Sequence, residues 1–402
     1  MLLARPASLR DELASALPER PFTLRFWDDS ELPATSGNGD GPTFSVRSPA
    51  AVAHMLRAPG QLGLGRAYAA GELEVDDLDK VIALLDTYKP APIDHAVRAR
   101  LALAAVRACG LMLPPPIPPA ELQPSGRRHS KERDARAIRH HYDVGNDFFR
   151  LFLGETMTYS CAVWRGAETL EEAQRDKLEL VCTKLKLKAG ERVLDVGCGW
   201  GAFVMHAARN HGVSAVGITL SPPQAELARR RVEDAGLSDR VEIRLADYRD
   251  LAGERYDAIA SIGMVEHVGS SQIDLYARQL AALLPQGGRL LNHGISRLRH
   301  GDPEAGPFSE RYVFPDAAPL HLSRVQMALE GADFITQHVE GFAADYARTL
   351  GEWIANLDAN LEEAQRLAGA ERLRVWRLYL RAARKGFLNG FTGIYQTLAV
   401  RA

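Results

Sequence analysis

The chain has 402 residues, of which 46% are hydrophobic and 25% are charged, and its formal net charge at pH 7 is −2. This composition is typical of a globular protein with room for more than one domain, and it excludes both a disordered chain and a nucleic-acid-binding protein that relies on a large positive charge. The four cysteines lack zinc-ligand spacing, so we expect no metal site and reduced thiols in a cytoplasmic protein.

The N-terminal region, residues 1–111, is expected to form an accessory domain. Apolar side chains recur at helical spacing over 48–58 and 78–88, and Ser48 is placed to cap the first of these helices. The proline-rich stretch LPPPIPP at 113–119 indicates a semi-rigid linker, which we place at 112–130. The second and larger domain is then expected to occupy residues 131–402.

Strands and helices alternate through the centre of the chain. Helices are predicted over 171–187, 201–212, 221–236 and 273–285, and strands over 192–197, 213–220, 240–248, 256–264 and 288–296. Strands separated by helices predict an α/β fold with a mostly parallel, Rossmann-like sheet. Residues 321–400 are expected to be mainly helical.

The sequence VLDVGCGWGAF at 193–203 places Gly197, Gly199 and Gly201 directly behind the first strand of this run. In an open α/β sheet this connection usually carries ligand contacts, and glycine lets the backbone approach a ligand that a Cβ would block. The G-x-G-x-G spacing differs from the dinucleotide fingerprint, and Asp195 at the strand end suits an ammonium group or ribose hydroxyls. The loop therefore favours S-adenosylmethionine over NAD, with a purely structural turn as the third interpretation.

Seven motifs between residues 141 and 350 resemble those of the cyclopropane fatty acid synthase family, which includes the mycolic acid cyclopropane synthases. They are HYDVGNDFF (141–149), TYSCAVW (158–164), LDVGCGWG (194–201), TLSPPQ (219–224), GMVEHVG (263–269), HGIS (293–296) and FAADYARTL (342–350). The resemblance implies a class I S-adenosylmethionine-dependent methyltransferase fold with a smaller N-terminal domain and helical C-terminal additions.

The same resemblance implies the remaining cofactor contacts. Most methyltransferases end the second strand with an acid that holds the ribose, whereas this chain has Thr219 there, and Gln224 is the nearest side chain able to bind two hydroxyls. The implied contacts are Tyr159 and Ser160 over the methionine end, Thr219, Leu220 and Gln224 at the ribose, and Asp247 and Tyr248 at the adenine.

In that family a cis double bond of a fatty acyl chain accepts the methyl group, and a bound bicarbonate ion removes a proton so that the ring closes. The family's bicarbonate ligands fall on Cys161, Glu266, His293, Ile295 (through its backbone) and Tyr346. Histidine and tyrosine can donate to an anion, and Glu266 can orient the imidazole or accept the bicarbonate proton. Protein carboxylates are the alternative base, with Glu266, Asp147 and Glu155 as candidates. Aromatic rings that could stabilise a cation are those of Tyr142, Phe148, Phe149, Trp164 and Phe342.

The expected substrate is a phospholipid with an unsaturated acyl chain, reached by peripheral contact with the inner face of the membrane. Two basic segments, 127–141 and 371–388, are candidates for headgroup contact or for ordinary solvated helix faces. A homodimer is a further expectation. Inside the family, the stretches 62–75 and 157–164 resemble relatives that leave a 10-methylene product for a partner reductase, as in tuberculostearic acid. A non-catalytic S-adenosylmethionine sensor and a methyltransferase for small polar substrates are the rivals from other classes.

Overall fold

The computed structural model describes residues 7–109, 115–123, 125–142, 144–299 and 306–402. The chain divides into two compact units: Met1–Leu122 together with Gly369–Ala382, and Gln123–Ala368 together with Ala383–Ala402. The N-terminal unit therefore includes a segment from near the C-terminal end of the chain. The expected ranges assign this segment to the second domain, 131–402, and not to the first, 1–111. Part of the linker predicted at 112–130, residues 112–114 and 124, lies outside the described residues. Among the described residues, no helix is both long and apolar enough to cross a bilayer.

The N-terminal unit is built from short helices around a four-stranded sheet of order β2-β1-β3-β4. Its elements are α1 (Ala7–Ala16), β1 (Thr23–Arg25), β2 (Glu31–Leu32), β3 (Thr43–Val46), α2 (Pro49–Arg57), α3 (Gln61–Ala69), β4 (Leu73–Val75), α4 (Leu78–Thr87) and α5 (His95–Cys109). The two helices predicted at 48–58 and 78–88 are α2 and α4. The predicted cap is confirmed, because the Ser48 side chain accepts a hydrogen bond from the backbone N–H of Ala50 at 3.0 Å.

The segment 369–382 belongs to this unit through polar and apolar contacts. The Glu371 carboxylate accepts from the backbone N–H of Ala120 at 2.9 Å, and Arg381 pairs with Asp79 at 3.1 Å. Val375 and Trp376 are buried. These apolar side chains, which the sequence placed in a candidate lipid-contacting helix, are therefore part of the protein interior.

The larger unit alternates strands and helices as predicted, and it ends in helices and two further strands. Its helices are α6 (Lys131–Tyr142), α7 (Asn146–Leu153), α8 (Leu170–Lys184), α9 (Ala202–His211), α10 (Pro222–Asp234), α11 (Ile273–Ala282), α12 (Pro307–Tyr312), α13 (Leu322–Glu330) and α14 (Ala343–Ala359). The long α15 (Leu361–Leu388) is broken at Gly369, where φ is +79°, and part of it belongs to the N-terminal unit. The strands are β5 (Arg192–Val196), β6 (Ser214–Thr219), β7 (Val241–Leu245), β8 (Ala258–Ile262), β9 (Arg289–Arg297), β10 (Phe334–Gly341) and β11 (Thr392–Arg401), with single 3₁₀ turns at Tyr248–Asp250 and Val265–His267.

The seven strands form one sheet of order β10-β11-β9-β8-β5-β6-β7. β5 to β9 pair in parallel, whereas β11 runs antiparallel to both β9 and β10. The order reverses at β5, since β6 and β8 lie on opposite sides of it. In a parallel sheet this switch point is where ligands bind, at the carboxyl ends of the strands.

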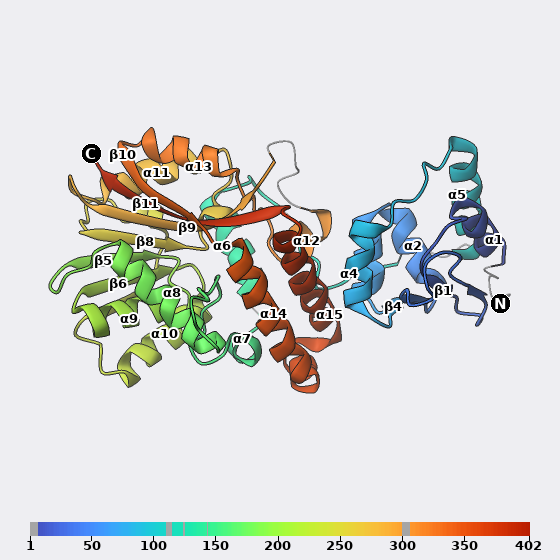
Figure 1. The fold of residues 1–402 in the computed structure, drawn as a ribbon, viewed down its shortest axis with the longest axis horizontal. Helices are drawn as coiled ribbons and strands as arrows, with labels where there is room; N and C mark the ends of the chain where they lie inside the picture. The colour runs from blue at the N-terminus through green and yellow to red at the C-terminus, as the bar shows by residue number, and fades with distance from the viewer. Residues whose placement is uncertain (1–6, 110–114, 124, 143, 300–305) are drawn as a thin grey trace. The chain divides into compact units, whose positions relative to one another are not determined.

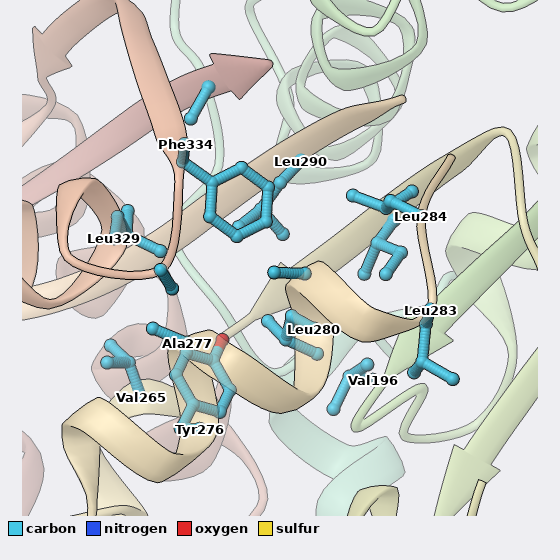
Figure 2. Packing of buried hydrophobic residues seen from close by; sticks show 14 of the residues in the cluster. Val196, Val265, Tyr276, Ala277, Leu280, Leu283, Leu284, Leu290, Leu329 and Phe334 are labelled. Carbon is cyan, nitrogen blue, oxygen red and sulfur yellow. The ribbon is translucent and has the colours of Figure 1, made fainter. Parts of the chain in front are cut away.

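Helices cover both faces of this sheet, with α11 and α13 on one side and α8, α9 and α10 on the other (Figure 1). Successive residues of a strand serve opposite cores: Leu194 of β5 packs towards α11 and α13, whereas Val193 packs towards α8 and α9. Figure 2 shows the first core, where Tyr276 and Leu280 of α11 pack with Phe334.

The C-terminal third departs from the expected mainly helical structure. The helices α13, α14 and α15 are present, but β10 and β11 add two strands to the sheet. β10 is an edge strand in which only Phe334 is buried. Because an edge strand exposes most of its side chains, the sequence FITQHVEG does not need the apolar alternation by which strands are predicted.

Candidate functional site

The glycine loop joins β5 to α9 at the switch point of the sheet. The backbone N–H groups of Gly197 and Cys198 both donate to the carbonyl of Ile218 in β6, at 3.0 and 2.9 Å, which holds the loop against the neighbouring strand. Gly199 has φ +54°, and a Cβ built on it would meet no atom within 4 Å. The loop therefore presents bare backbone to open space, as close approach to a ligand requires.

That space is a cavity of about 1200 Å³, open solvent at its mouth included. The predicted cofactor residues that line it are Tyr159, Ser160, Asp195, Gly197, Gly199, Thr219, Leu220, Gln224, Asp247 and Tyr248. Gly201 is not among the lining residues; it has φ +84° and starts α9 as the N-cap residue.

Asp195 lies at the end of β5 and is buried. Its Oδ1 has no hydrogen-bond partner among the residues that the structure describes. Burial raises the pKa of this carboxyl to about 7, although the ammonium group of Lys177 opposes the shift. A buried acceptor facing a cavity suits a cationic or hydroxyl-bearing ligand, and S-adenosylmethionine has both kinds of group.

Lys177 is a site residue that the sequence interpretation missed. It is fully buried on α8, lines the cavity, and its Nζ donates to Ser160 Oγ at 2.9 Å. Burial lowers the pKa of its ammonium group to about 8. The available signal was its place on the buried face of α8, between Ala173 and Val181, where a lysine needs a partner.

The second strand ends in a small hydroxyl–amide pair. Thr219 Oγ1 donates to Gln224 Oε1 at 2.7 Å, and both side chains are buried. Ser221, which caps α10, accepts from the backbone N–H of Gln224. The pair fixes the Gln224 amide beside the cavity, where the amide can bind hydroxyls.

The two residues predicted at the adenine have different surroundings. Both carboxylate oxygens of Asp247 accept from Arg249, at 2.8 and 2.5 Å, so this carboxylate is neutralised inside the protein. The Tyr248 ring is half-buried at the cavity wall. Arg249, which also pairs with Asp134 at 3.0 Å, lines the cavity and was not predicted.

Glu266 and Ile295 lie together beyond the cavity, after β8 and within β9. The backbone N–H of Ile295 donates to Glu266 Oε1 at 2.7 Å, so this N–H is already taken by the carboxylate. Glu266 Oε2 is buried and has no hydrogen-bond partner among the described residues. Burial raises the pKa of this carboxyl to about 7, against the opposing hydrogen bond from Ile295.

His293, two residues earlier on β9, is held by a chain of side chains. Lys184 Nζ donates to Gln396 Oε1 at 2.6 Å, and the Gln396 amide nitrogen lies 3.4 Å from His293 Nδ1. Because the amide nitrogen can only donate, this contact assigns the imidazole proton to Nε2. His293 Nε2 is buried without a partner among the described residues. Burial lowers the pKa of the imidazole well below its usual value, so the ring is neutral.

Phe342 connects Cys161, His293 and Tyr346. Its carbonyl accepts from the Cys161 thiol at 3.7 Å and from the Tyr346 backbone N–H at 2.9 Å, and its ring lies 5.9 Å from the His293 ring. Burial raises the pKa of Cys161 well above its usual value, so the group is a neutral thiol. The five predicted base-site residues are thus linked as Glu266 with Ile295, and as Cys161, His293 and Tyr346 around Phe342.

The remaining candidates divide between interior and surface. Phe148 and Phe149 are fully buried, and the Phe149 ring lies 5.6 Å from that of Tyr159 at the cavity wall. Trp164 instead stacks against the exposed Arg348, whose guanidinium lies 3.8 Å from the ring centroid. The side chains of Asp147 and Glu155 are exposed, so neither is placed in a water-free site.

Comparisons with known proteins place the chain in a family. The family model described as mycolic acid cyclopropane synthetase matches residues 129–397. A protein of Mycobacterium tuberculosis named probable fatty acid methyltransferase is 39% identical to this chain over an alignment of 403 residues. The alignment covers 97% of this chain and 93% of that protein. Cyclopropane-fatty-acyl-phospholipid synthase of Escherichia coli is 34% identical over 352 residues, covering 87% and 86%.

The crystal structure of mycolic acid cyclopropane synthase CmaA1 complexed with SAH and CTAB is similar with a TM-score of 0.63 and 34% identity, covering 66% of this chain and 98% of that one. Membership of one family accounts for the matched motifs, for the strand order of the sheet and for the cavity at the switch point of the sheet. The chain belongs to the mycolic acid cyclopropane synthetase family of S-adenosylmethionine-dependent lipid methyltransferases.

Proposed function

We propose that this protein transfers the methyl group of S-adenosylmethionine to the cis double bond of an unsaturated acyl chain of a phospholipid and closes a cyclopropane ring. One observation carries the proposal. Beyond the cofactor cavity the protein buries a hydrogen-bond donor, His293 Nε2, and an acceptor, Glu266 Oε2, with no partner for either among the described residues. Leaving such groups unpaired costs about 1–3 kcal/mol each, so they are expected to serve a ligand.

The hydrogen-bonding capacity of a bicarbonate ion is complementary to that of these two groups. Its charged oxygens accept hydrogen bonds and its hydroxyl donates one, which matches the neutral His293 donor and the Glu266 acceptor. The resemblance adds Cys161 and Tyr346 as further ligands, and the Cys161 thiol, which donates to the Phe342 carbonyl here, would have to turn away from it to reach the ion. Bound there, bicarbonate would supply a proton acceptor in a buried place, and the protein would hold it through His293 and Glu266.

The cofactor residues have a complementary task. S-adenosylmethionine, when bound, supplies an electrophilic methyl group. Asp195, Gln224 and the glycine loop would orient it. The buried aromatic wall around Phe149 and Tyr159 excludes water, which would otherwise trap a cation on the acyl chain, and its ring faces stabilise positive charge.

The direct test is lipid mass spectrometry of a bacterial host that expresses the protein. Each modified unsaturated chain should gain the mass of one CH₂ group. Fragmentation then separates a ring from a 10-methylene product, which would form if a hydride shifted between the two chain carbons before the added methyl group lost its proton, and which a partner reductase would convert to a 10-methyl branch. Unchanged lipids with active cofactor binding would contradict the proposal and leave a sensor or a small-molecule methyltransferase.

A second test concerns the base. Turnover should fall in thoroughly degassed buffer and return when bicarbonate is added. Full activity without carbonate would shift the base role to Glu266, because Asp147 and Glu155 are exposed.

We also propose where the protein meets the inner face of the membrane. Much of the basic segment 127–141 is engaged internally, since Arg133 pairs with Asp316 at 2.5 Å and Lys131 pairs with Asp250. Three apolar side chains, Leu298, Leu388 and Phe391, are instead 39%, 60% and 48% exposed. They meet where β9 and α15 end: the backbone N–H of Leu298 donates to the Phe391 carbonyl at 3.5 Å, and the exposed Arg299 follows.

This apolar group with a neighbouring cation suits an anionic lipid surface. The variants Leu388→Glu and Phe391→Glu should lose binding to vesicles that contain anionic phospholipid. The control is Met327→Glu, which places the same charge at a 66% exposed apolar residue of α13. Equal vesicle binding by all four proteins would remove this surface from the proposal.

A further inference from the structure

A cluster of metal-binding side chains lies outside the site described above, between α8 and α9. Cys182, His206 and His211 each offer a ligand atom, and these atoms all lie within 4.8 Å of one another. Glu179, one turn before Cys182 on α8, adds a carboxylate: its Oε2 lies 3.0 Å from His206 Nε2 and 3.1 Å from His211 Nε2. Four donors from two helices thus point at one place.

We propose that this cluster binds a zinc ion through Cys182, His206, His211 and Glu179. Thiolate, two imidazoles and a carboxylate are the donors that zinc takes in four-coordinate sites, whereas magnesium and calcium take oxygen donors. Tetrahedral bonds to such ligands place the donor atoms roughly 3.3–3.8 Å apart. Small side-chain rotations from the present separations reach that range.

The surroundings suit a metal site. Cys182 is fully buried, and the His206 and His211 side chains are only 14% and 19% exposed, while Glu179 at 50% leaves an entry path. Asn210 Nδ2 lies beside the His206 ring, 3.1 Å from Nδ1 and 3.3 Å from Nε2. We expect metal binding to turn this amide over so that its oxygen accepts the Nδ1 proton, which is the outer-shell contact that metal-bound histidines usually have.

The cluster has a structural consequence for the cofactor site. α8 carries Lys177, which lines the cavity, and α9 begins directly after the glycine loop. A metal bridge between the C-terminal parts of these two helices fixes their spacing. Cysteine spacing gave no sign of the site, because each helix supplies only two of the ligands and only one of the four is a cysteine.

The test uses the full chain, stripped with a chelator and then titrated with zinc in competition with a chromophoric chelator. We expect one zinc per chain, and cobalt in its place should give the charge-transfer band of a cobalt–thiolate bond. Cys182→Ser and His211→Gln should each weaken zinc affinity by more than about 100-fold, since loss of an outer-shell partner alone costs about 10–100-fold. His211 is at the helix end and partly exposed, so this variant keeps the test valid if Cys182→Ser does not fold.

Two matched controls separate the cluster from other thiols and imidazoles. Cys109→Ser removes a buried cysteine of the N-terminal unit. His338→Gln removes an exposed histidine whose Nε2 lies 3.5 Å from Oε2 of Glu340. Both should bind zinc like the unchanged protein and keep the rise in melting temperature that zinc produces. Absence of stoichiometric zinc, equal binding by His211→Gln, or cobalt spectra without a thiolate band would overturn the proposal.

Discussion

Asp195 is a buried carboxyl group near the buried ammonium group of Lys177. Ionisation of Asp195 lowers the free energy of unfolding by an amount that depends on pH. Its pKa in the folded chain is raised to about 7 by burial, against about 3.9 in an unfolded chain. The folded protein therefore binds more protons between these values, so the stability that this group contributes is full below about pH 4 and is lost as the pH rises through 7. Above pH 7 the ionised Asp195 carboxylate therefore makes the fold less stable than an uncharged side chain would.

The variant Asp195→Asn should consequently bind S-adenosylmethionine poorly and yet unfold at higher urea than the unchanged protein at pH 8 without cofactor. The expected gain is about 1–4 kcal/mol, since one pKa unit corresponds to about 1.4 kcal/mol. The gain should shrink as the pH falls towards 4. Asp176→Asn, which changes an exposed aspartate beside Lys177 on α8, is the control and should show neither effect.

Glu266 and His293 are predicted to act on one shared anion after the methyl group has moved. Loss of either should lower kcat far more than it changes cofactor affinity, by about 10²–10⁴-fold as for a positioned proton-transfer group. The double variant Glu266→Gln/His293→Gln should be little worse than the poorer single variant. Steady-state kinetics on the four proteins, with cofactor affinity measured separately, decide this; additive losses would mean that the two residues act independently.

At the scale of elements, we predict that the loop between β5 and α9 binds S-adenosylmethionine through its bare backbone. Gly199→Val should abolish S-adenosylmethionine binding, because the added side chain projects into the cavity space. Gly190→Val is the matched control: this glycine also has positive φ, +86°, and open space around its Cβ position, but it is exposed on the turn before β5. Calorimetry showing the same affinity for both variants would remove the loop from the site.

The loop 158–164 is held to α14 by the buried Thr349 hydroxyl together with the Asp345 carboxylate, which accepts from the Trp164 backbone N–H at 2.7 Å. Thr349 Oγ1 accepts from the Ala162 backbone N–H at 3.2 Å and from the Trp164 indole at 3.0 Å, and it donates to the Asp345 carbonyl at 2.7 Å. Thr349 is fully buried, so Thr349→Val keeps the shape and leaves these partners unsatisfied.

We expect Thr349→Val to lower the free energy of unfolding by about 1–3 kcal/mol and to loosen the loop that carries Tyr159 and Cys161. Thr87→Val, which removes an exposed hydroxyl that contacts only its own helix, should have a small effect. Urea unfolding together with amide hydrogen exchange of the loop measures both effects. A variant as stable as Thr87→Val would show that the hydroxyl does not hold the loop.

At the scale of the whole molecule, the segment 369–382 makes the N-terminal unit discontinuous. The segment buries four apolar side chains, those of Leu373, Val375, Trp376 and Leu380. The rest of the unit to which the segment belongs is residues 1–122. A chain that starts at Gln123 should therefore expose these apolar side chains, bind a hydrophobic dye and aggregate in light-scattering measurements.

The control is the same shortened chain with residues 370–381 replaced by a glycine–serine linker, which should neither aggregate nor bind the dye. If the shortened chain with its own segment also stayed free of aggregates and bound no dye, the apolar side chains would be covered by other parts of the protein.

The sequence by itself determined those features that depend on neighbours along the chain. The Ser48 cap, the glycine loop after β5, and the alternation of strands and helices all follow from local geometry and periodicity. Most of the residues that the matched motifs predict to bind the cofactor line one cavity. Only the tertiary structure decided which partners each side chain meets. Periodicity shows that Lys177 lies on the buried face of α8, but the proximity of Asp195 depends on packing against the sheet. The chain from Lys184 through Gln396 to His293, the edge strand β10, and the metal-binding cluster likewise join residues far apart in sequence, whose contacts are set by how helices and strands pack.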